Sequence, residues 1–217
     1  MPAGSTGSIS PGAFDALIDR LASQLGPVVV PIPAGGSVIR AAVSLLLRSG
    51  PQEAGKGIDG GAEILFIKRS EREGDPWSGH IAFPGGRLDA GDSSLVDVAV
   101  REVSEEVGID LRRGGRILGS LPSVKPLSAH VPPVEVTPFL ALPPADSVLH
   151  PDPAEVDDVF WIPLAVLQQA GPTEVVRRRV GGETREWKAY PSPRGPIWGI
   201  TERILSSFLA LAPAPRQ

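Results

Sequence analysis

The side chains best suited to chemistry are three glutamates, Glu102, Glu105 and Glu106, in the run REVSEEVGI. Residues three and four apart are neighbours on a helix surface, so these carboxylates would share one patch and repel each other. A divalent cation would resolve that repulsion, and oxygen ligands suit Mg²⁺ or Mn²⁺, which also take substrate phosphate oxygens. The pattern therefore indicates metal-assisted phosphate ester or anhydride chemistry. The alternative is an acidic helix face that is simply solvated.

These glutamates lie on an expected helix over residues 95–107. Ser93 and Ser94 offer N-caps, and Gly108 is a typical C-terminal stop. With about 100° of rotation per residue, four valines form one stripe that should pack on a sheet: Val96, Val100, Val103 and Val107. The three glutamates are expected to project away from this stripe. Upstream, residues 81–83 have the composition of a strand, and residues 84–86, Pro-Gly-Gly, predict a turn.

Other elements are expected on both sides of this segment. Apolar residues at helical spacing predict an opening helix over 11–25 and a closing helix over 197–211. Residues rich in Val, Ile and Leu predict strands, and Gly181-Gly182 predicts a hairpin turn. The expected strands are 37–47, 62–68, 117–124, 134–142 and 156–162, with the hairpin formed by 174–180 and 183–190. The sequence therefore favours the α/β class, a mixed β-sheet flanked by helices.

Composition excludes several classes of protein. The 217 residues contain no cysteine, so disulfides, thiol catalysis and thiolate zinc sites are absent. A net charge of −4 argues against a protein whose main affinity is for nucleic-acid phosphates. No apolar run reaches the roughly 18 residues that cross a bilayer, and the first residues lack a basic stretch followed by an apolar one. We expect a cytoplasmic protein with no membrane segment and no nucleic-acid partner.

Gly86 and the run from Arg101 to Ile109 resemble the Nudix box, whose family pattern is G-x5-E-x7-R-E-U-x-E-E-x-G-U with U aliphatic. Every position of the R-E-U-x-E-E-x-G-U half is met. The first half departs from the pattern, because fifteen steps rather than fourteen separate Gly86 from Arg101 and Asp92 replaces the early glutamate. Nudix proteins similar to coenzyme A diphosphatases share the extra residue and the aspartate. The chain thus resembles that subgroup.

The resemblance extends over roughly residues 37 to 210. Upstream, the runs Lys68-Arg69-Ser70 and Phe83-Pro84-Gly85-Gly86 are similar to the subgroup's signature, as are the runs 136–139, 155–164 and 197–201 downstream. Two departures lie between the upstream runs. Asp75 stands where the subgroup has an arginine, and the interval from Arg69 to Gly79 is one residue longer. Trp77 lies in this altered stretch, which leaves substrate choice open.

The family resemblance implies a Nudix-type α/β/α sandwich that hydrolyses X–P–O–P–Y by attack of water on one phosphorus. It divides the chain into an N-terminal helix and Pro/Gly-rich lead-in (1–36), a Nudix hydrolase domain (37–211) and a C-terminal tail (212–217). Mg²⁺ or Mn²⁺ would be the cofactor, and the partner would be a small-molecule diphosphate. The N-terminal helix could serve a homodimer or belong to the core.

Residue roles follow from the same resemblance. Glu102, Glu105 and Glu106 would be metal ligands, and Arg101 would orient a carboxylate. The catalytic set would be Arg101, Glu105 and Glu155, with Glu155 acting as a ligand or general base and Asp157 and Asp158 as rivals for that role. Residues expected to contact the substrate are Arg69, Trp77, Gly85 and Gly86.

Several features remain open between structural and functional interpretations. His80, His130 and His150 have no spaced partners that would make a zinc site or a triad. Trp77 and Trp187 could pack or could cover a nucleotide ring. The run Arg177-Arg178-Arg179 is typical of a solvated strand edge, or it could contact phosphate. The preferred function is cleavage of coenzyme A or its derivatives. The alternatives are hydrolysis of ADP-ribose, dinucleotides or nucleoside triphosphates, and a nucleotide-binding Nudix module without turnover.

Overall fold

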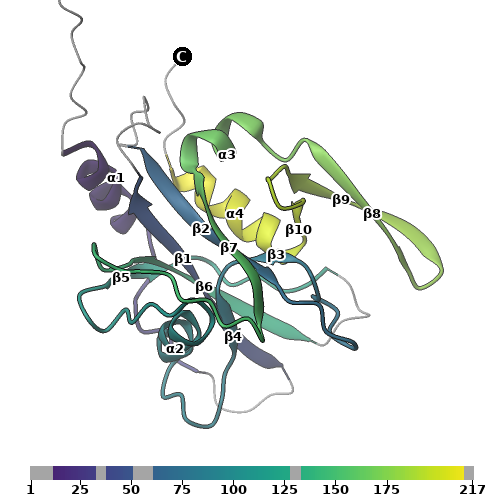
Figure 1. Ribbon diagram of the computed structural model, residues 1–217, viewed down its shortest axis with the longest axis horizontal. Coiled ribbons are helices and arrows are strands. Elements are labelled where there is room, and N and C mark those ends of the chain that lie inside the picture. The colour runs from purple at the N-terminus through teal and green to yellow at the C-terminus, as the bar shows by residue number, and fades with distance from the viewer. Residues whose placement is uncertain (1–11, 33–37, 51–60, 128–132, 213–217) are drawn as a thin grey trace, which may run out of the picture.

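The computed structural model describes residues 12–32, 38–50, 61–127 and 133–212 (Figure 1). Four helices and ten strands are present in this part of the chain. In chain order they are α1 (Gly12–Ala22), β1 (Ile39–Ser49), β2 (Ala62–Arg69), β3 (Ile81–Ala82), β4 (Gly85–Arg87), α2 (Leu95–Val107), β5 (Arg116–Ser120), β6 (Val134–Leu142), β7 (Val156–Pro163), α3 (Leu164–Ala170), β8 (Glu174–Val180), β9 (Glu183–Tyr190), β10 (Ile197–Trp198) and α4 (Ile200–Leu211).

The strands form a mixed main sheet and a smaller antiparallel sheet. In the main sheet the order is β3-β2-β1-β6-β5, with β4 pairing to β1 and β7 pairing to β2. The β1–β6 pair is parallel, and the other pairs of this sheet are antiparallel. The smaller sheet has the order β10-β9-β8. Parallel and antiparallel neighbours in one sheet confirm the predicted mixed architecture.

Alternation along β1 and β2 divides the core into two faces, since successive side chains of a strand point to opposite sides. Leu45 and Phe66 pack on the face that α1, α3 and α4 cover. Leu46 and Leu65 pack on the opposite face with the valines of α2. Figure 1 shows α2 and α4 on opposite sides of the strands. This arrangement of helix, sheet and helix layers confirms the predicted α/β/α sandwich.

The opening helix belongs to the core. Leu17, Ile18 and Leu21 are buried on α1 and lie in the same apolar cluster as Ile204 and Phe208 of α4. Of the two alternatives for this helix, the structure therefore supports a core element. None of the helices in the described segments is long and apolar enough to cross a membrane.

Several local predictions were wrong or incomplete; among them, the strand predicted over 117–124 ends at Ser120. Residues 85–87 form β4 and not a turn, because glycines without side chains let the backbone lie directly against β1. The closing helix begins at Ile200 and not at residue 197, since Ile197 and Trp198 pair with β9 as β10. Helix α3 was not predicted, because its seven residues are too few to show a helical period. The predicted strand 134–142 and both arms of the hairpin were confirmed.

Candidate active site

Helix α2 carries the acidic motif, and its ends are fixed as the sequence predicts. The Oγ atom of Ser94 accepts a hydrogen bond from the backbone N–H of Asp97 at 3.2 Å. At the other end, Gly108 has a left-handed φ of 74°, and its N–H donates to the carbonyl of Ser104. Val100, Val103 and Val107 are buried against the sheet. The helix therefore has a fixed rotation about its axis, which decides where each glutamate points.

Glu106 does not project away from the core, so the prediction for its side chain was wrong. It is only 1% exposed, because β4 passes over this part of the helix. The backbone N–H of Gly85 donates to Glu106 Oε2 at 2.8 Å. The neighbouring Glu105 side chain is 56% exposed. One helix turn therefore carries a buried and an exposed carboxylate.

Glu102 lies against the second glycine of the β4 edge. A Cβ atom on Gly86 would come within 2.1 Å of Glu102 Oε1, and a Cβ on Gly85 would meet the carbonyl of Ala42 at 2.3 Å. The clash at Gly85 is with backbone atoms and leaves no room for a side chain, whereas a Cβ on Gly86 would displace the Glu102 carboxylate. The two glycines therefore let the backbone approach the carboxylates of α2.

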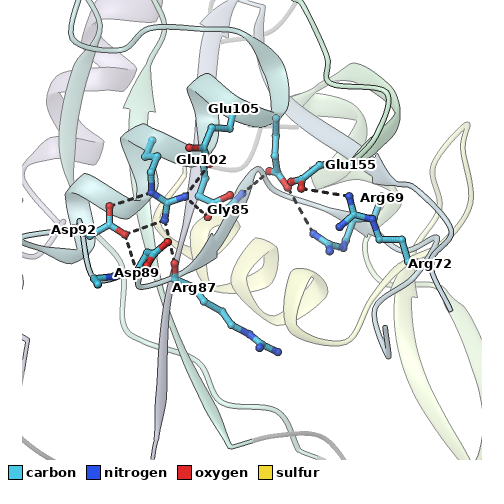
Figure 2. Close-up of polar contacts among 12 residues, drawn as sticks. Arg69, Arg72, Gly85, Arg87, Asp89, Asp92, Glu102, Glu105 and Glu155 are labelled. Carbon is cyan, nitrogen blue, oxygen red and sulfur yellow. Dashed lines mark hydrogen bonds and ion pairs between the residues drawn. The ribbon is translucent and has the colours of Figure 1, made fainter. Parts of the chain in front are cut away.

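Arg101 links the acids of this region in one network. Its Nε and Nη2 atoms donate to the two oxygens of Asp92 at 3.1 and 2.9 Å, and Nη2 also donates to the carbonyl of Arg87. Its Nη1 atom donates to Glu102 at 2.8 Å and to Glu105 at 2.9 Å. Figure 2 shows Asp92 on one side of these contacts and the two glutamates on the other. Hydrogen bonding to Arg101 lowers the pKa of Asp92, so this carboxylate stays charged.

Glu155 reaches the same site from a loop distant in sequence. The N–H of His150 donates to the carbonyl of Val107 at 2.9 Å, and the N–H of Asp152 donates to the carbonyl of Glu106 at 3.2 Å. These two bonds tie the loop to the C-terminal end of α2. The Glu155 carboxylate lies 3.3 Å from Arg72 Nη2 (Figure 2). The loop is thus held from both sides.

The two rivals of Glu155 have other partners. Asp157 forms an ion pair with Lys68 at 2.6 Å, and Asp158 forms one with Arg194. Neither belongs to the acidic cluster that contains Glu155. Of the three candidates, the geometry therefore favours Glu155.

Carboxylate oxygens of Glu102, Glu106 and Glu155 lie within 4.8 Å of one another. We call this group the acidic cluster. Burial raises the pKa of Glu106 to about 8 and also raises the pKa of Glu102. Burial thus disfavours the charged forms of these two acids, although an arginine lies within 4 Å of each carboxylate of the cluster: Arg101 at Glu102, Arg69 at Glu106 and Arg72 at Glu155. Three hard oxygen donors at this spacing fit Mg²⁺ or Mn²⁺. Glu105, which pairs with Arg101, lies outside the cluster.

Arg69 borders the acidic cluster and is held by the altered segment. Its Nη2 atom donates to Asp75 at 3.0 Å, and its Nη1 atom lies 3.6 Å from Glu106. Asp75 also accepts from the N–H of Trp77 at 2.9 Å. Burial opposes the charged form of Asp75, but the bonds from Trp77 and Arg69 outweigh it, and the pKa of Asp75 is lowered. The Nε atom of Arg69 is buried and has no hydrogen-bond acceptor among the residues described.

A cavity of about 1260 Å³ opens beside this edge. All four residues expected to contact substrate line it: Arg69, Trp77, Gly85 and Gly86. The cavity continues to the β8–β9 hairpin, where Arg178, Trp187 and Trp198 form part of its wall. The glycine edge therefore separates the acidic cluster from a space much longer than a single phosphate.

Sequence reasoning missed some residues of this site and left others open. Arg72 and Arg87 line the cavity, yet no local pattern distinguishes them from other surface arginines. His80 also lines the cavity, and burial together with Arg178 lowers its pKa to about 4. His150 lies at the end of α2, and His130 falls outside the described residues. Within the described segments, the one cluster of potential metal ligands contains no histidine.

Comparisons with known proteins agree with this geometry. The NUDIX domain family model matches residues 40–184. The uncharacterized Nudix hydrolase NudL of Salmonella paratyphi B is 35% identical over 131 residues, which cover 59% of this chain and 64% of that protein. The same values hold for NudL of Salmonella newport. The match thus spans just under two thirds of these relatives.

A solved structure of similar fold covers nearly all of the chain. The MutT/nudix family protein from Enterococcus faecalis superposes with a TM-score of 0.52 and 16% identity, over 97% of this chain and 75% of that one. At this identity the likeness concerns the fold alone.

Proposed function

The chain belongs to the NUDIX domain family, and on that premise we propose that it hydrolyses a diphosphate linkage in a small phosphorylated substrate with the help of a divalent cation. One observation carries the proposal. Carboxylate oxygens of Glu102, Glu106 and Glu155 converge within 4.8 Å of one another directly behind the glycine edge of a large cavity. Three oxygen donors this close would hold a divalent cation next to a diphosphate at that edge.

Glu102, Glu106 and Glu155 would hold Mg²⁺ or Mn²⁺. When bound, such a cation lowers the pKa of a coordinated water and neutralises charge that develops on the departing phosphate. We also assign Glu105 as a further ligand, because its exposed carboxylate adjoins the cluster and shares Arg101 with Glu102. Arg101 fixes both of these carboxylates, and Asp92 in turn fixes Arg101.

The other residues of the site act on the substrate and on the proton. Arg69, which lines the cavity, would bind a phosphate oxygen. A water oxygen bonds to one phosphorus, the bond from that phosphorus to the bridging oxygen breaks, and two phosphate monoesters leave. Glu155 would also accept the proton that the water loses, because a carboxylate that binds the cation through one oxygen keeps its second oxygen free to act as a base.

We propose coenzyme A or its derivatives as the substrate. The products would be 3′,5′-ADP and a phosphopantetheine. Two features support this choice: the spacing from Gly86 to Arg101 with Asp92 at the early acidic position, and a cavity of about 1260 Å³. Pockets for drug-sized ligands usually measure roughly 300 to 1000 Å³, so this one has room for an extended substrate.

A second candidate substrate class rests on the altered segment. Asp75 stands where the coenzyme A subgroup has an arginine, and it neutralises much of the charge of Arg69. Less positive charge at this edge favours substrates with fewer phosphates, such as ADP-ribose or a dinucleotide. Values of kcat/KM for coenzyme A, ADP-ribose, NADH and deoxynucleoside triphosphates would rank the two classes.

Product analysis tests the proposed activity. The purified protein with Mg²⁺ should convert coenzyme A to 3′,5′-ADP and a phosphopantetheine, and a chelator should stop the reaction. Glu106→Gln should lose turnover. Glu63→Gln is the matched control, because Glu63 is a buried carboxylate that pairs with Arg48 away from the cavity. Binding of nucleotides without hydrolysis under any metal would support the non-catalytic alternative and overturn the proposal.

A further inference from the structure

The three consecutive arginines of β8 have different surroundings. Arg177 forms an ion pair with Glu186 at 2.6 Å, and Arg179 donates to the carbonyl of Gly182. Arg178 points to the other face of the hairpin, as strand alternation requires. Its guanidinium lies 5.8 Å from the centre of the Trp198 ring, and it lines the cavity. Only the middle arginine therefore faces the proposed substrate.

A second arginine lies directly opposite Arg178. The β8–β9 register pairs Arg178 with Arg185, and like charges at opposed positions destabilise a strand pair. No carboxylate of the described residues forms an ion pair with either one. Glu183 shares this face two residues from Arg185, yet no ion pair joins them. Two exposed cations therefore face each other without compensation, and a bound anion would remove the repulsion.

Aromatic rings lie beside these cations. The centres of the Trp187 and Trp198 rings are 5.6 Å apart, and the centre of the Trp198 ring lies 4.5 Å from that of His80. All three rings are half-buried and line the cavity. Arg185 borders a smaller hollow of about 340 Å³ that shares Leu127, Glu186 and Trp187 with the main cavity, and the Glu186 carboxylate there is paired with Arg177. An apolar surface for a planar ring thus adjoins a site for an anion.

We propose that Arg178, Arg185, Trp187 and Trp198 form a specificity subsite for a nucleoside that carries a phosphate monoester of its own, apart from the diphosphate that is cleaved. We call this group the hairpin wall. The base packs on the tryptophans, and the monoester lies between the two arginines. The inference rests on the proposed function for the position of the diphosphate at the glycine edge. It adds that the substrate is selected by a charge remote from the reacting bond.

Binding measurements test the hairpin wall without any turnover. Adenosine 3′,5′-bisphosphate and 5′-AMP would be titrated into the full chain, with calorimetry or tryptophan fluorescence as the readout. The parent protein should bind the bisphosphate at least about tenfold more tightly, since charge-assisted bonds to phosphate are strong. Arg178→Gln and Arg185→Gln should each remove most of that preference. Arg177→Gln should keep it, because Arg177 is paired with Glu186 and does not line the cavity.

Steady-state kinetics give an independent test with coenzyme A and 3′-dephospho-coenzyme A. Arg178→Gln should lower kcat/KM about tenfold for coenzyme A through KM, and should leave the dephosphorylated substrate unchanged. Equal affinities for the two nucleotides in the parent protein, or an equal loss in Arg177→Gln, would overturn the subsite. A binding preference without hydrolysis would overturn the proposed function and support the subsite. If hydrolysis were unchanged both by Arg178→Gln and by removal of the 3′-phosphate, the subsite would be overturned and the proposed function would be supported.

Discussion

The acidic cluster and the hairpin wall hold charged side chains in opposite ways. Glu102, Glu106 and Glu155 are held by a backbone bond from Gly85, by Arg101 and by the bonds that tie the loop before β7 to the end of α2. Arg178 and Arg185 are exposed on a two-stranded ribbon and have no ionic partner among the described residues. Each carboxylate of the cluster has an arginine within 4 Å, whereas the two arginines of the wall have no carboxylate partner among the described residues.

The side chains proposed to take part in the reaction and those proposed to select the substrate therefore lie in different parts of the molecule. A group that stabilises a transition state must be held in place before the reaction. A group that selects a substrate can remain solvated until the ligand arrives, because its contribution is binding. Changes in the cluster should therefore act on kcat, and changes in the wall should act on KM. Substitutions in the two regions test this division.

Replacing Glu106 should separate activity from stability most strongly. Glu106→Gln should lower kcat by about a thousandfold, because several kcal/mol of transition-state stabilisation depend on the cation. Its thermal unfolding without metal should change little, since the pKa of about 8 means that the buried group is largely neutral at pH 7. Glu63→Gln should do the opposite. It should lose about 1 to 3 kcal/mol of stability through its unpaired arginine and keep its kcat. Similar kcat values for Glu106→Gln and Glu63→Gln would contradict the catalytic role of the acidic cluster.

The glycine edge should be nearly as sensitive. Gly86→Ala places a Cβ atom against Glu102, so the carboxylate must move and kcat should fall by about a hundredfold. Gly91→Ala is the matched control, because a Cβ there meets nothing within 4 Å. Rates for the two variants under saturating substrate would decide. An unchanged rate in Gly86→Ala would show that the position of Glu102 is unimportant.

Asp92 should contribute through Arg101. Asp92→Asn removes the two-pronged ionic contact, and we expect about tenfold lower kcat and about 1 to 3 kcal/mol lower stability. The pKa of Asp92 is lowered in the folded protein, so its contribution is present at neutral pH and is lost as acid protonates it. Urea unfolding should therefore show the full stability difference at pH 7 and a progressively smaller one as the pH is lowered below the ordinary value of 3.8. A difference that does not shrink in acid would contradict the charged pairing.

The titration of His80 should have the smallest effect on stability, and it tests whether Arg178 of the hairpin wall lies close to this ring. Its pKa of about 4 in the folded protein lies below the ordinary value of 6.5, because burial and then Arg178 disfavour the charged ring, while Asp75 favours it and Arg69 opposes it. Unfolding thus takes up a proton between these values, and the free energy of unfolding should fall as the pH is lowered from about 6.5 to about 4. NMR titration should give the low pKa, and Arg178→Gln should raise it. A value of 6.5 in both proteins would contradict this environment.

Local chemistry made part of this structure predictable. The ends of α2 follow from Ser94 and Gly108, and the hairpin turn follows from Gly181-Gly182, because each signal lies within a few residues of the feature it determines. The Nudix pattern likewise placed Arg101 beside the glutamates.

Tertiary contacts decided the remainder. Glu106 is buried because β4 crosses α2, and Arg72 meets Glu155 across 83 positions of sequence. The special place of Arg178 depends on the register of two strands. A single sequence contains the residues that make these contacts, but it does not show which of them come close together in the fold.

Diffraction from crystals grown with Mn²⁺ and a non-hydrolysable diphosphate analogue tests the central claim most directly. The account predicts an anomalous peak bonded to carboxylate oxygens of Glu102, Glu106 and Glu155 at about 2.1 to 2.2 Å, with the diphosphate on the glycine edge. A diphosphate bound elsewhere in the cavity, with no anomalous peak at the acidic cluster, would contradict it.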